Sequence, residues 1–437
     1  MTRTAATPPP TADVPRRGLL LVGAAIVLTG FNLRTAVGSV GPVLEEIEQG
    51  LGISSGLAGL VTSMPVICFA LIGFAGPPLA ARFRDGHVLA AALLVMSLGI
   101  VGRAVVDGPA LFLVGTVAAM VGGALGNVML PGLVKKWFPG RTGLLVGAYG
   151  AALSLGSALS SVVSPRVAEA VGDDGWRWGL GLWAAFALAA ALPWLAVPVR
   201  SAAGRRPAAV RLRSLGRSRL AWAMAAFFGL QSMQAYVLIG WVAQYLRDEG
   251  MSQSTAGLLV GLNGLIGIPL GALVPSGTVR QHWQRPMLLG FVSCYLAGWT
   301  GLLLAPLTLT WVWIGLLAVG MATFPMVLAL IGLRGRTPES VAALSTVTQG
   351  WGYALAGIGP LLVGVLRGVT GGYTGMFVLV YVATAGLLVT GWQVCRERYV
   401  DDEVSGLAAP AGAAVAGRDE QVEVAGAEPP VIVNPGK

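Results

Sequence analysis

Residues 18–43 read GLLLVGAAIVLTGFNLRTAVGSVGPV, and this stretch decides the class of fold. It exceeds the roughly 18 apolar residues that a membrane-spanning helix requires, and Arg34 is its only charged residue. A guanidinium in hydrocarbon costs about 2.5–3.5 kcal/mol on insertion scales. It also keeps its proton under all ordinary conditions. Arg34 therefore needs a partner, a water-filled cavity or an anionic ligand.

The rest of the chain has the composition of a polytopic α-helical membrane protein. Of its 437 residues, 55% are apolar and 11% are charged, whereas a soluble protein has about 25% charged residues. The 63 glycines suit membrane helices that pack closely. Cys68, Cys294 and Cys395 have no disulfide or metal spacing, so we interpret them as small core residues. We expect no metal and no cofactor.

The apolar runs predict twelve membrane-spanning helices. They are expected at about 18–43, 51–76, 87–105, 109–132, 143–165, 176–199, 220–246, 254–275, 286–305, 309–333, 340–366 and 374–395. Residues 1–17 are a polar N-terminal tail. Residues 396–437 form a second tail, which is acidic at Asp401, Asp402 and Glu403, continues with Ala, Gly and Pro, and is expected to be disordered.

The distribution of basic residues predicts the orientation in the membrane. The segments on the side of the N-terminus hold 23 Lys and Arg residues. The loops on the other side hold five basic residues, Arg103, Arg166, Arg177, Arg247 and Arg367. They also hold nine acidic residues, Glu45, Glu46, Glu48, Asp107, Glu169, Asp173, Asp174, Asp248 and Glu249. The positive-inside rule then places both termini in the cytoplasm.

An internal repeat divides the chain into two halves. Gly52-Ile53-Ser54 and Ala58-Gly59-Leu60 match Gly250-Met251-Ser252 and Ala256-Gly257-Leu258 at an offset of 198 residues. We expect six-helix halves at 18–199 and 220–395, joined by a basic cytoplasmic linker at 200–219. Parallel repeats of six spans are the layout of the major facilitator transporters, so this is the predicted fold.

The loop after the second span resembles the general facilitator signature only weakly. Arg82 occupies the expected arginine position, but Ala81 stands where the signature has aspartate. Asp85 is a possible substitute in a different register, and Arg280 occupies the equivalent position in the second half. We take Arg82, Asp85 and Arg280 as candidate gating-loop residues.

Five short segments resemble the cyanate / 2-nitroimidazole transporter family of the major facilitators. They are NLRTAV (32–37) with GPVL (41–44), GNVMLP (126–131) with Lys135, GLQSMQAY (229–236), FPM (324–326) with GLR (332–334), and TQGWGY (348–353). The resemblance covers both halves. It implies transport of a small, often anionic or nitro-bearing solute across a bacterial inner membrane, and it leaves the solute and the direction open.

The same segments supply residue types that a small-anion site needs. Arg34 has fixed charge and a planar fork that suits an oxyanion or cyanate. Amides inside the spans can donate hydrogen bonds without adding charge. The candidates are Asn32, Asn127, Gln231, Gln234, Asn263 and Gln349. Aromatic residues with one polar group can line a compact pocket. These candidates are Tyr149, Tyr236 and Tyr353.

Each candidate also has a structural interpretation. Arg34 could bind backbone carbonyls near Pro42, and each amide could join two helices. No carboxylate is expected within a span, whereas proton-coupled facilitators usually carry one. We therefore predict uniport, anion exchange, or symport through a proton carried by the substrate.

Three other functions compete with transport of a small anion. A multidrug or metabolite exporter of the same fold is the nearest alternative, although a lone buried arginine argues against cationic drugs. A solute sensor without transport would need a folded signalling domain, and the tails are short. An enzyme is not expected, because no nucleophile–base cluster or phosphate loop occurs in the chain. The expected partners are a small solute and the bilayer, with no nucleic acid, and the chain is expected to be a monomer.

Overall fold

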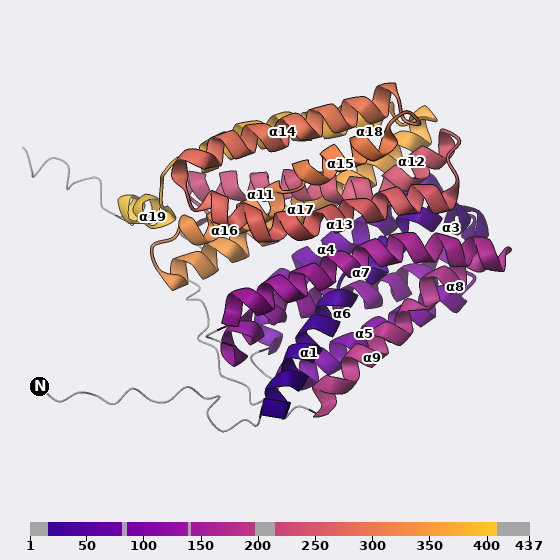
Figure 1. Cartoon of the computed structure of the whole chain (residues 1–437), viewed down its shortest axis with the longest axis horizontal. Coiled ribbons are helices and arrows are strands. Elements are labelled where there is room, and N and C mark those ends of the chain that lie inside the picture. The colour runs from indigo at the N-terminus through magenta and orange to yellow at the C-terminus, as the bar shows by residue number, and fades with distance from the viewer. Residues whose placement is uncertain (1–15, 81–84, 139–140, 197–214, 409–437) are drawn as a thin grey trace, which may run out of the picture.

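The computed structural model describes residues 16–80, 85–138, 141–196 and 215–408, and all regular structure in these ranges is helical (Figure 1). Twelve of its segments are long and apolar enough to cross a membrane. The prediction of twelve spans is confirmed. The predicted linker up to residue 214, the first tail up to residue 15, the second tail from residue 409, and Arg82 lie outside the described residues.

The first six spans include several irregular helices. They are formed by α1 (Arg16–Asn32), α2 (Thr35–Gly38), the 3₁₀ turn η1 (Gly41–Val43) and α3 (Leu44–Leu51); α4 (Ser55–Ala80); α5 (Asp85–Val105); α6 (Pro109–Trp137); α7 (Thr142–Val171); and α8 (Gly175–Gly181) with α9 (Trp183–Ala196).

The last six spans follow the same plan. They are formed by α11 (Arg219–Val237), the π-helical turn η3 (Leu238–Val242) and α12 (Ala243–Asp248); α13 (Gln253–Thr278); α14 (Gln281–Leu304); α15 (Thr310–Gly320) with α16 (Thr323–Leu333); α17 (Pro338–Thr370); and α18 (Thr374–Val394).

The repeated sequence marks the same turn in both halves. Gly52 and Gly250 follow α3 and α12 with φ angles of 60° and 104°, a left-handed conformation that glycine adopts without a Cβ penalty. Ser54 and Ser252 then accept hydrogen bonds from Leu57 N and Thr255 N at the start of the next helix. The repeat therefore encodes one helix end and one helix start.

The later glycines of the repeat bring the two halves into contact. A Cβ on Gly59 of α4 would lie 3.0 Å from the carbonyl oxygen of Pro360 in α17. A Cβ on Gly257 of α13 would lie 2.4 Å from the carbonyl oxygen of Ser161 in α7. Only glycine allows such close helix contact. α4 thus packs on α17 and α7 packs on α13, in a pseudo-symmetric arrangement.

The molecule has two ends along the direction of its spans. α3, α8 and α12 lie at the first end, which we call the α3 end (Figure 1). α19 (Val400–Ala408) and the start of α1 lie at the opposite end, which we call the α19 end (Figure 1). All spans run between these ends.

The prediction of a disordered tail from residue 396 is wrong for residues 400–408, which form α19. Val400 is 1% exposed, and its N–H donates to Arg334 O at 2.9 Å. Asp402 forms an ion pair with Arg336 at 2.9 Å, and the hydrogen bond from Arg336 holds the pKa of Asp402 below its usual range. Composition alone missed α19, because tertiary contacts stabilise this short helix.

Candidate functional site

The first span is broken at the candidate arginine. α1 ends at Asn32 and α2 begins at Thr35, and Arg34 between them has φ −121° and ψ 0°. Further along, Pro42 has no N–H to offer Gly38 O, and Ser161 Oγ donates to that carbonyl instead at 3.0 Å. Irregular backbone at membrane depth is tolerated only where the protein or a cavity satisfies its polar groups.

Arg34 lies among aromatic rings. Its guanidinium carbon is 5.9 Å from the centroid of the Phe324 ring, and its charge acts on the hydroxyls of Tyr236 and Tyr353. The residue is partly exposed. Within the described part of the chain, no side-chain hydrogen bond or ion pair involves Arg34. Its charge is therefore available to an anionic ligand.

Both tyrosines come from the second half. Tyr236 of α11 is 3% exposed, and its hydroxyl has no hydrogen-bond partner among the described residues. Tyr353 of α17 is 6% exposed and lies within hydrogen-bonding reach of the Asn127 side chain from α6. Its ring packs edge-on against Phe228 with a centroid separation of 4.9 Å. An unpaired buried hydroxyl costs free energy unless a ligand or a water satisfies it.

Five of the ten predicted binding residues are thus brought together. Tyr149 of α7 lies near Tyr353, and its backbone would contact any side chain placed at Gly30 of α1. The assembled set is Arg34, Asn127, Tyr149, Tyr236 and Tyr353. These residues come from spans of both halves, as expected for a site that alternating access exposes to each side in turn.

Two of the predicted amides join helices of a single half. Asn32 Nδ2 donates to Leu28 O at 2.9 Å and to Phe186 O at 3.1 Å, so it joins α1 to α9. Its Oδ1 is buried and has no hydrogen-bond partner among the described residues. Gln234 Oε1 accepts from Trp299 at 2.6 Å, and its Nε2 donates to Thr384 at 3.0 Å. A place at the binding site stays a prediction for both amides. Helical spacing alone did not reveal which face each one occupies.

The remaining three amides make fewer hydrogen bonds. Gln349 lies one turn before Tyr353 on the same face of α17, is partly exposed, and donates to Ser345 Oγ at 2.7 Å. Gln231 is buried and donates to Ser232 Oγ at 2.5 Å. Asn263 is 8% exposed, and its Oδ1 has no partner among the described residues. Of the three, Gln349 is the one that shares a helix face with the assembled set.

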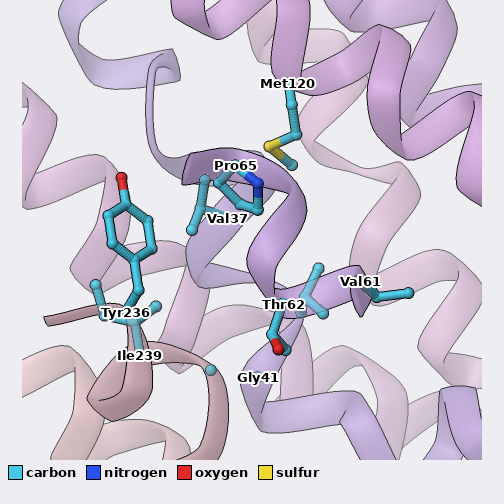
Figure 2. Close-up of a pocket in the computed structure, with 10 residues that line it drawn as sticks. Val37, Gly41, Val61, Thr62, Pro65, Met120, Tyr236 and Ile239 are labelled. Carbon is cyan, nitrogen blue, oxygen red and sulfur yellow. The ribbon is translucent and has the colours of Figure 1, made fainter. Parts of the chain in front are cut away.

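A small cavity lies between the two halves, next to Tyr236. It has a volume of about 10 Å³, close to the minimum for one water molecule. Figure 2 shows Tyr236 and Ile239 of the second half on one side of it and Val37 and Thr62 of the first half on the other. A Cβ on Gly41 would lie only 2.1 Å from Ile239 O. The path from the site toward the α3 end is therefore closed at this level.

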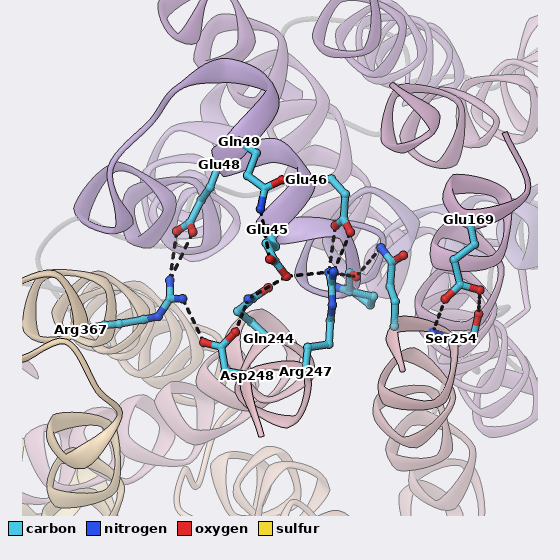
Figure 3. Close-up of polar contacts among 12 residues, drawn as sticks. Glu45, Glu46, Glu48, Gln49, Glu169, Gln244, Arg247, Asp248, Ser254 and Arg367 are labelled. Atoms are coloured by element: carbon cyan, nitrogen blue, oxygen red, sulfur yellow. Dashed lines mark hydrogen bonds and ion pairs between the residues drawn. The ribbon is translucent and has the colours of Figure 1, made fainter. Parts of the chain in front are cut away.

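Beyond the cavity, Arg247 joins the two halves at the α3 end (Figure 3). Its guanidinium binds Glu46 with both Nη atoms, at 2.9 and 2.7 Å, and pairs with Glu45 at 2.9 Å. At the same end, Glu169 of α7 accepts from the N–H of Ser254 in α13 at 2.9 Å. The bidentate pair of Arg247 with Glu46 fixes the geometry as well as the charge of this contact between the halves.

Arg367 makes a second connection between the halves. It lies between Glu48 at 3.2 Å and Asp248 at 3.0 Å, as Figure 3 shows. The Tyr373 hydroxyl also donates to Asp248 at 2.7 Å. Burial and this hydrogen bond raise the pKa of Tyr373, so its hydroxyl keeps the proton that it donates. The sequence places all these residues on one side of the membrane, but no local pattern indicates which of them pair.

Two of the candidate gating-loop residues, Asp85 and Arg280, lie near the α19 end. Asp85, at the start of α5, forms an ion pair with Lys136 of α6 at 2.9 Å. This pair lies within the first half. Arg280 is exposed at the start of α14. A link between the halves through these two residues is not seen in the described part of the chain.

Sequence reasoning missed Arg103, which it places in an outer loop. The structure places it inside α5 with no exposed surface. Its Nη1 donates to Ala36 O at 3.1 Å and its Nη2 to Ser39 Oγ at 3.2 Å. The interpretation failed because Arg103 lies three residues before the end of an apolar run, where burial depends on the neighbouring helices.

Residues 22–360 match the Major Facilitator Superfamily, and the chain belongs to this family of membrane transporters. The prediction that it is not an enzyme is confirmed by this membership.

Two curated relatives narrow the comparison. The chain is 35% identical to the 2-nitroimidazole transporter of Escherichia coli (strain K12) over 385 residues, which cover 86% of this chain and 95% of the relative. It is 28% identical to the cyanate transport protein CynX of the same organism over 365 residues, which cover 83% and 94%. The resemblance stated from the sequence is confirmed.

A solved structure gives the same fold. A bacterial homolog of the human lysosomal transporter Spinster, in an inward-facing and unoccupied conformation, matches with a TM-score of 0.70. The match covers 88% of this chain and 99% of that chain at 15% identity. The predicted fold of twelve spans in two parallel-repeat halves is confirmed.

Proposed function

We propose that this transporter moves a small anionic or nitro-bearing solute, of the size of cyanate or a nitroimidazole, with Arg34 as its electrostatic anchor. The single observation that carries the proposal is the state of Arg34. It is a cation at a break in the first span, surrounded by Phe324, Tyr236 and Tyr353, and no described carboxylate pairs with it. The two relatives support the solute class, since their names state transport of 2-nitroimidazole and cyanate.

The site suits a planar solute in particular. A guanidinium can donate two parallel hydrogen bonds to a carboxylate-like or nitro group. The unpaired hydroxyl of Tyr236 offers a third polar contact. The rings of Phe324 and Tyr353 provide flat apolar walls. A bulky cationic drug would meet repulsion from Arg34 and no balancing carboxylate among the described residues of the site.

The conformation supports alternating access from the α19 end. The ion pairs of Arg247 and Arg367 close the α3 end, while Arg34 remains partly exposed. The basic residues near the α19 end favour a cytoplasmic position for it and for both termini. Under this assignment the structure is an inward-facing state, in a bacterial inner membrane, with the chain acting as a monomer.

The test is solute counterflow in proteoliposomes, with cyanate and 2-nitroimidazole as solutes. We expect Arg34→Gln to reduce uptake by at least tenfold and Arg34→Lys to retain part of it, because lysine keeps the charge without the fork. Arg166→Gln is the matched control, since Arg166 is exposed on α7 and donates to Val162 O of its own helix. Wild-type rates in folded Arg34→Gln would remove the anchor role and favour the efflux alternative, with a larger and more apolar site.

A further inference from the structure

Arg103 is a buried cation whose partners are neutral. It has no exposed surface, and its two hydrogen bonds go to the carbonyl of Ala36 and the hydroxyl of Ser39. Its Nε has no hydrogen-bond partner among the described residues, and no ion pair there involves it. An uncompensated buried charge is costly, so the contacts that it makes call for a specific explanation.

The backbone hydrogen bonds of the first span provide that explanation. In a continuous helix, Val40 N–H would donate to Ala36 O. Here it donates to Val37 O at 3.3 Å, which leaves the Ala36 carbonyl without its helical donor. The Ser39 hydroxyl donates to this carbonyl at 3.4 Å, and Arg103 supplies the shorter hydrogen bond at 3.1 Å while also donating to Ser39 Oγ. Poorly satisfied carbonyls are costly in the membrane, so Arg103 stabilises the broken form relative to the continuous helix.

Arg34 is joined directly to the turn that Arg103 holds. The carbonyl of Arg34 accepts from Val37 N at 3.2 Å and from Gly38 N at 2.8 Å. If Val40 N–H donated to Ala36 O, the turn would take up α-helical hydrogen bonding. The side chains that precede the turn would then point in other directions. Each residue of an α-helix is rotated by about 100° from the previous one, so even a small change in winding re-aims the guanidinium.

We propose that Arg103 is the positioning residue for Arg34: it holds the break in the first span open, so that the anion-binding guanidinium faces the site. This inference rests on the proposed function. It concerns a residue on α5 that makes no contact with the solute. Two arginines inside the membrane thus have different roles, one toward the solute and one toward the backbone.

The first experiment reports the direction of residue 34 and requires no solute. Cys68, Cys294 and Cys395 are replaced by alanine, Arg34→Cys is introduced, and a positively charged methanethiosulfonate reagent is applied from the α19 side. We expect Arg103→Met to slow labelling of the cysteine by about tenfold. Arg103→Lys should restore most of the rate, because an ammonium still donates to one of the two acceptors.

Arg334→Gln is the matched control. Arg334 is 2% exposed, and it likewise binds a backbone carbonyl, Val394 O at 3.0 Å, and an amide, Gln284 Oε1 at 2.6 Å. It does so in the second half and should leave labelling at position 34 unchanged. Labelling of Arg103→Met at the parent rate would overturn the proposal, and so would an equal slowing in Arg334→Gln.

The second experiment separates positioning from folding. With Arg34 in place, Arg103→Met should raise the KM for cyanate or 2-nitroimidazole about tenfold, with a smaller change in kcat. The melting temperature should not fall, since replacing a buried unpaired charge by an apolar side chain is often neutral or stabilising. If the wild type moves neither solute, the proposed solute class is wrong, while the labelling experiment still decides the role of Arg103. A loss of transport that tracks a loss of folded protein would reduce Arg103 to a structural residue.

Discussion

At the scale of single residues, Tyr236 and Gln234 show how two neighbours on α11 differ in role. The Tyr236 hydroxyl is buried and unpaired among the described residues. We expect Tyr236→Phe to leave the melting temperature unchanged, because no described hydrogen bond is lost, and to raise the KM for the solute by about three- to tenfold. Counterflow kinetics and thermal unfolding in detergent would measure both quantities. A lower melting temperature with an unchanged KM would show that the hydroxyl has a structural role.

Gln234→Met should give the opposite result. Its amide bonds Trp299 and Thr384. The substitution leaves the buried Nε1 of Trp299 without a partner, whereas Thr384 keeps its hydrogen bond to Val380 O at 2.7 Å. An unpaired buried donor costs about 1–3 kcal/mol. We expect a lower melting temperature and an unchanged KM. A raised KM at full stability would return Gln234 to the binding site.

Residue-level prediction from the sequence succeeded where chemistry alone was decisive. Arg34 could be singled out because it is the only charged residue in the apolar run 18–43. The role of Asn32 and Gln234 could not be settled, because an amide in an apolar helix suits a site and a helix contact equally well. Arg103 was missed because its burial depends on a break in another span, which leaves no signal near position 103.

At the scale of elements, α19 supports the starts of two other helices. Glu403 accepts from Leu220 N at 3.1 Å and Ser218 Oγ at 2.7 Å at the start of α11. Asp401 accepts from Arg336 N at 2.8 Å and binds the Ser340 hydroxyl near the start of α17. Helix N-terminal N–H groups favour such carboxylates.

Deletion of residues 400–437 should therefore lower the melting temperature. Loss of a capping carboxylate costs about 0.5–2 kcal/mol, and a change of 1 kcal/mol shifts the melting temperature by roughly 2–4 °C in a large domain. A deletion of 409–437, which keeps α19, is the control. Equal melting temperatures for both deletions would show that α19 contributes nothing to stability.

Elements were predicted well where length and apolar character suffice, and poorly where tertiary contacts decide. The twelve spans follow from the apolar runs. The breaks at Arg34 and at Met321–Ala322, and the π-helical turn η3, do not. At the first break, side chains from other helices satisfy the Ala36 and Gly38 carbonyls, so no local pattern reveals it. The α19 helix is too short to form on local propensity.

At the scale of the whole molecule, the ion pairs at the α3 end hold the two halves together in this conformation. We expect Arg367→Gln to remove the link between the halves to Glu48, together with the pair to Asp248 within the second half, and to shift the population toward a state open at that end. With about 1 kcal/mol from partly exposed pairs, the shift should be about fivefold. The measurement is labelling of Val40→Cys with a membrane-impermeant thiol reagent applied from the side of the α3 end.

The control for this experiment is Arg177→Gln. Arg177 pairs with Asp107 and Asp174 at 2.8 and 3.2 Å at the same end of the molecule, but all three residues belong to the first half. Its loss should leave the labelling rate of Val40→Cys unchanged. If both variants increased labelling equally, loosening of this end in general would explain the result better than release of a link between halves.

The glycine contacts between the halves have a mechanical consequence. At Gly41, Gly59 and Gly257, backbone meets backbone with no side chain between them. Surfaces of this kind do not interlock, so one half can roll over the other without waiting for side chains to change rotamer. An added methyl group at any of the three would act as a stop, and the carrier would be held in the state where that contact is open.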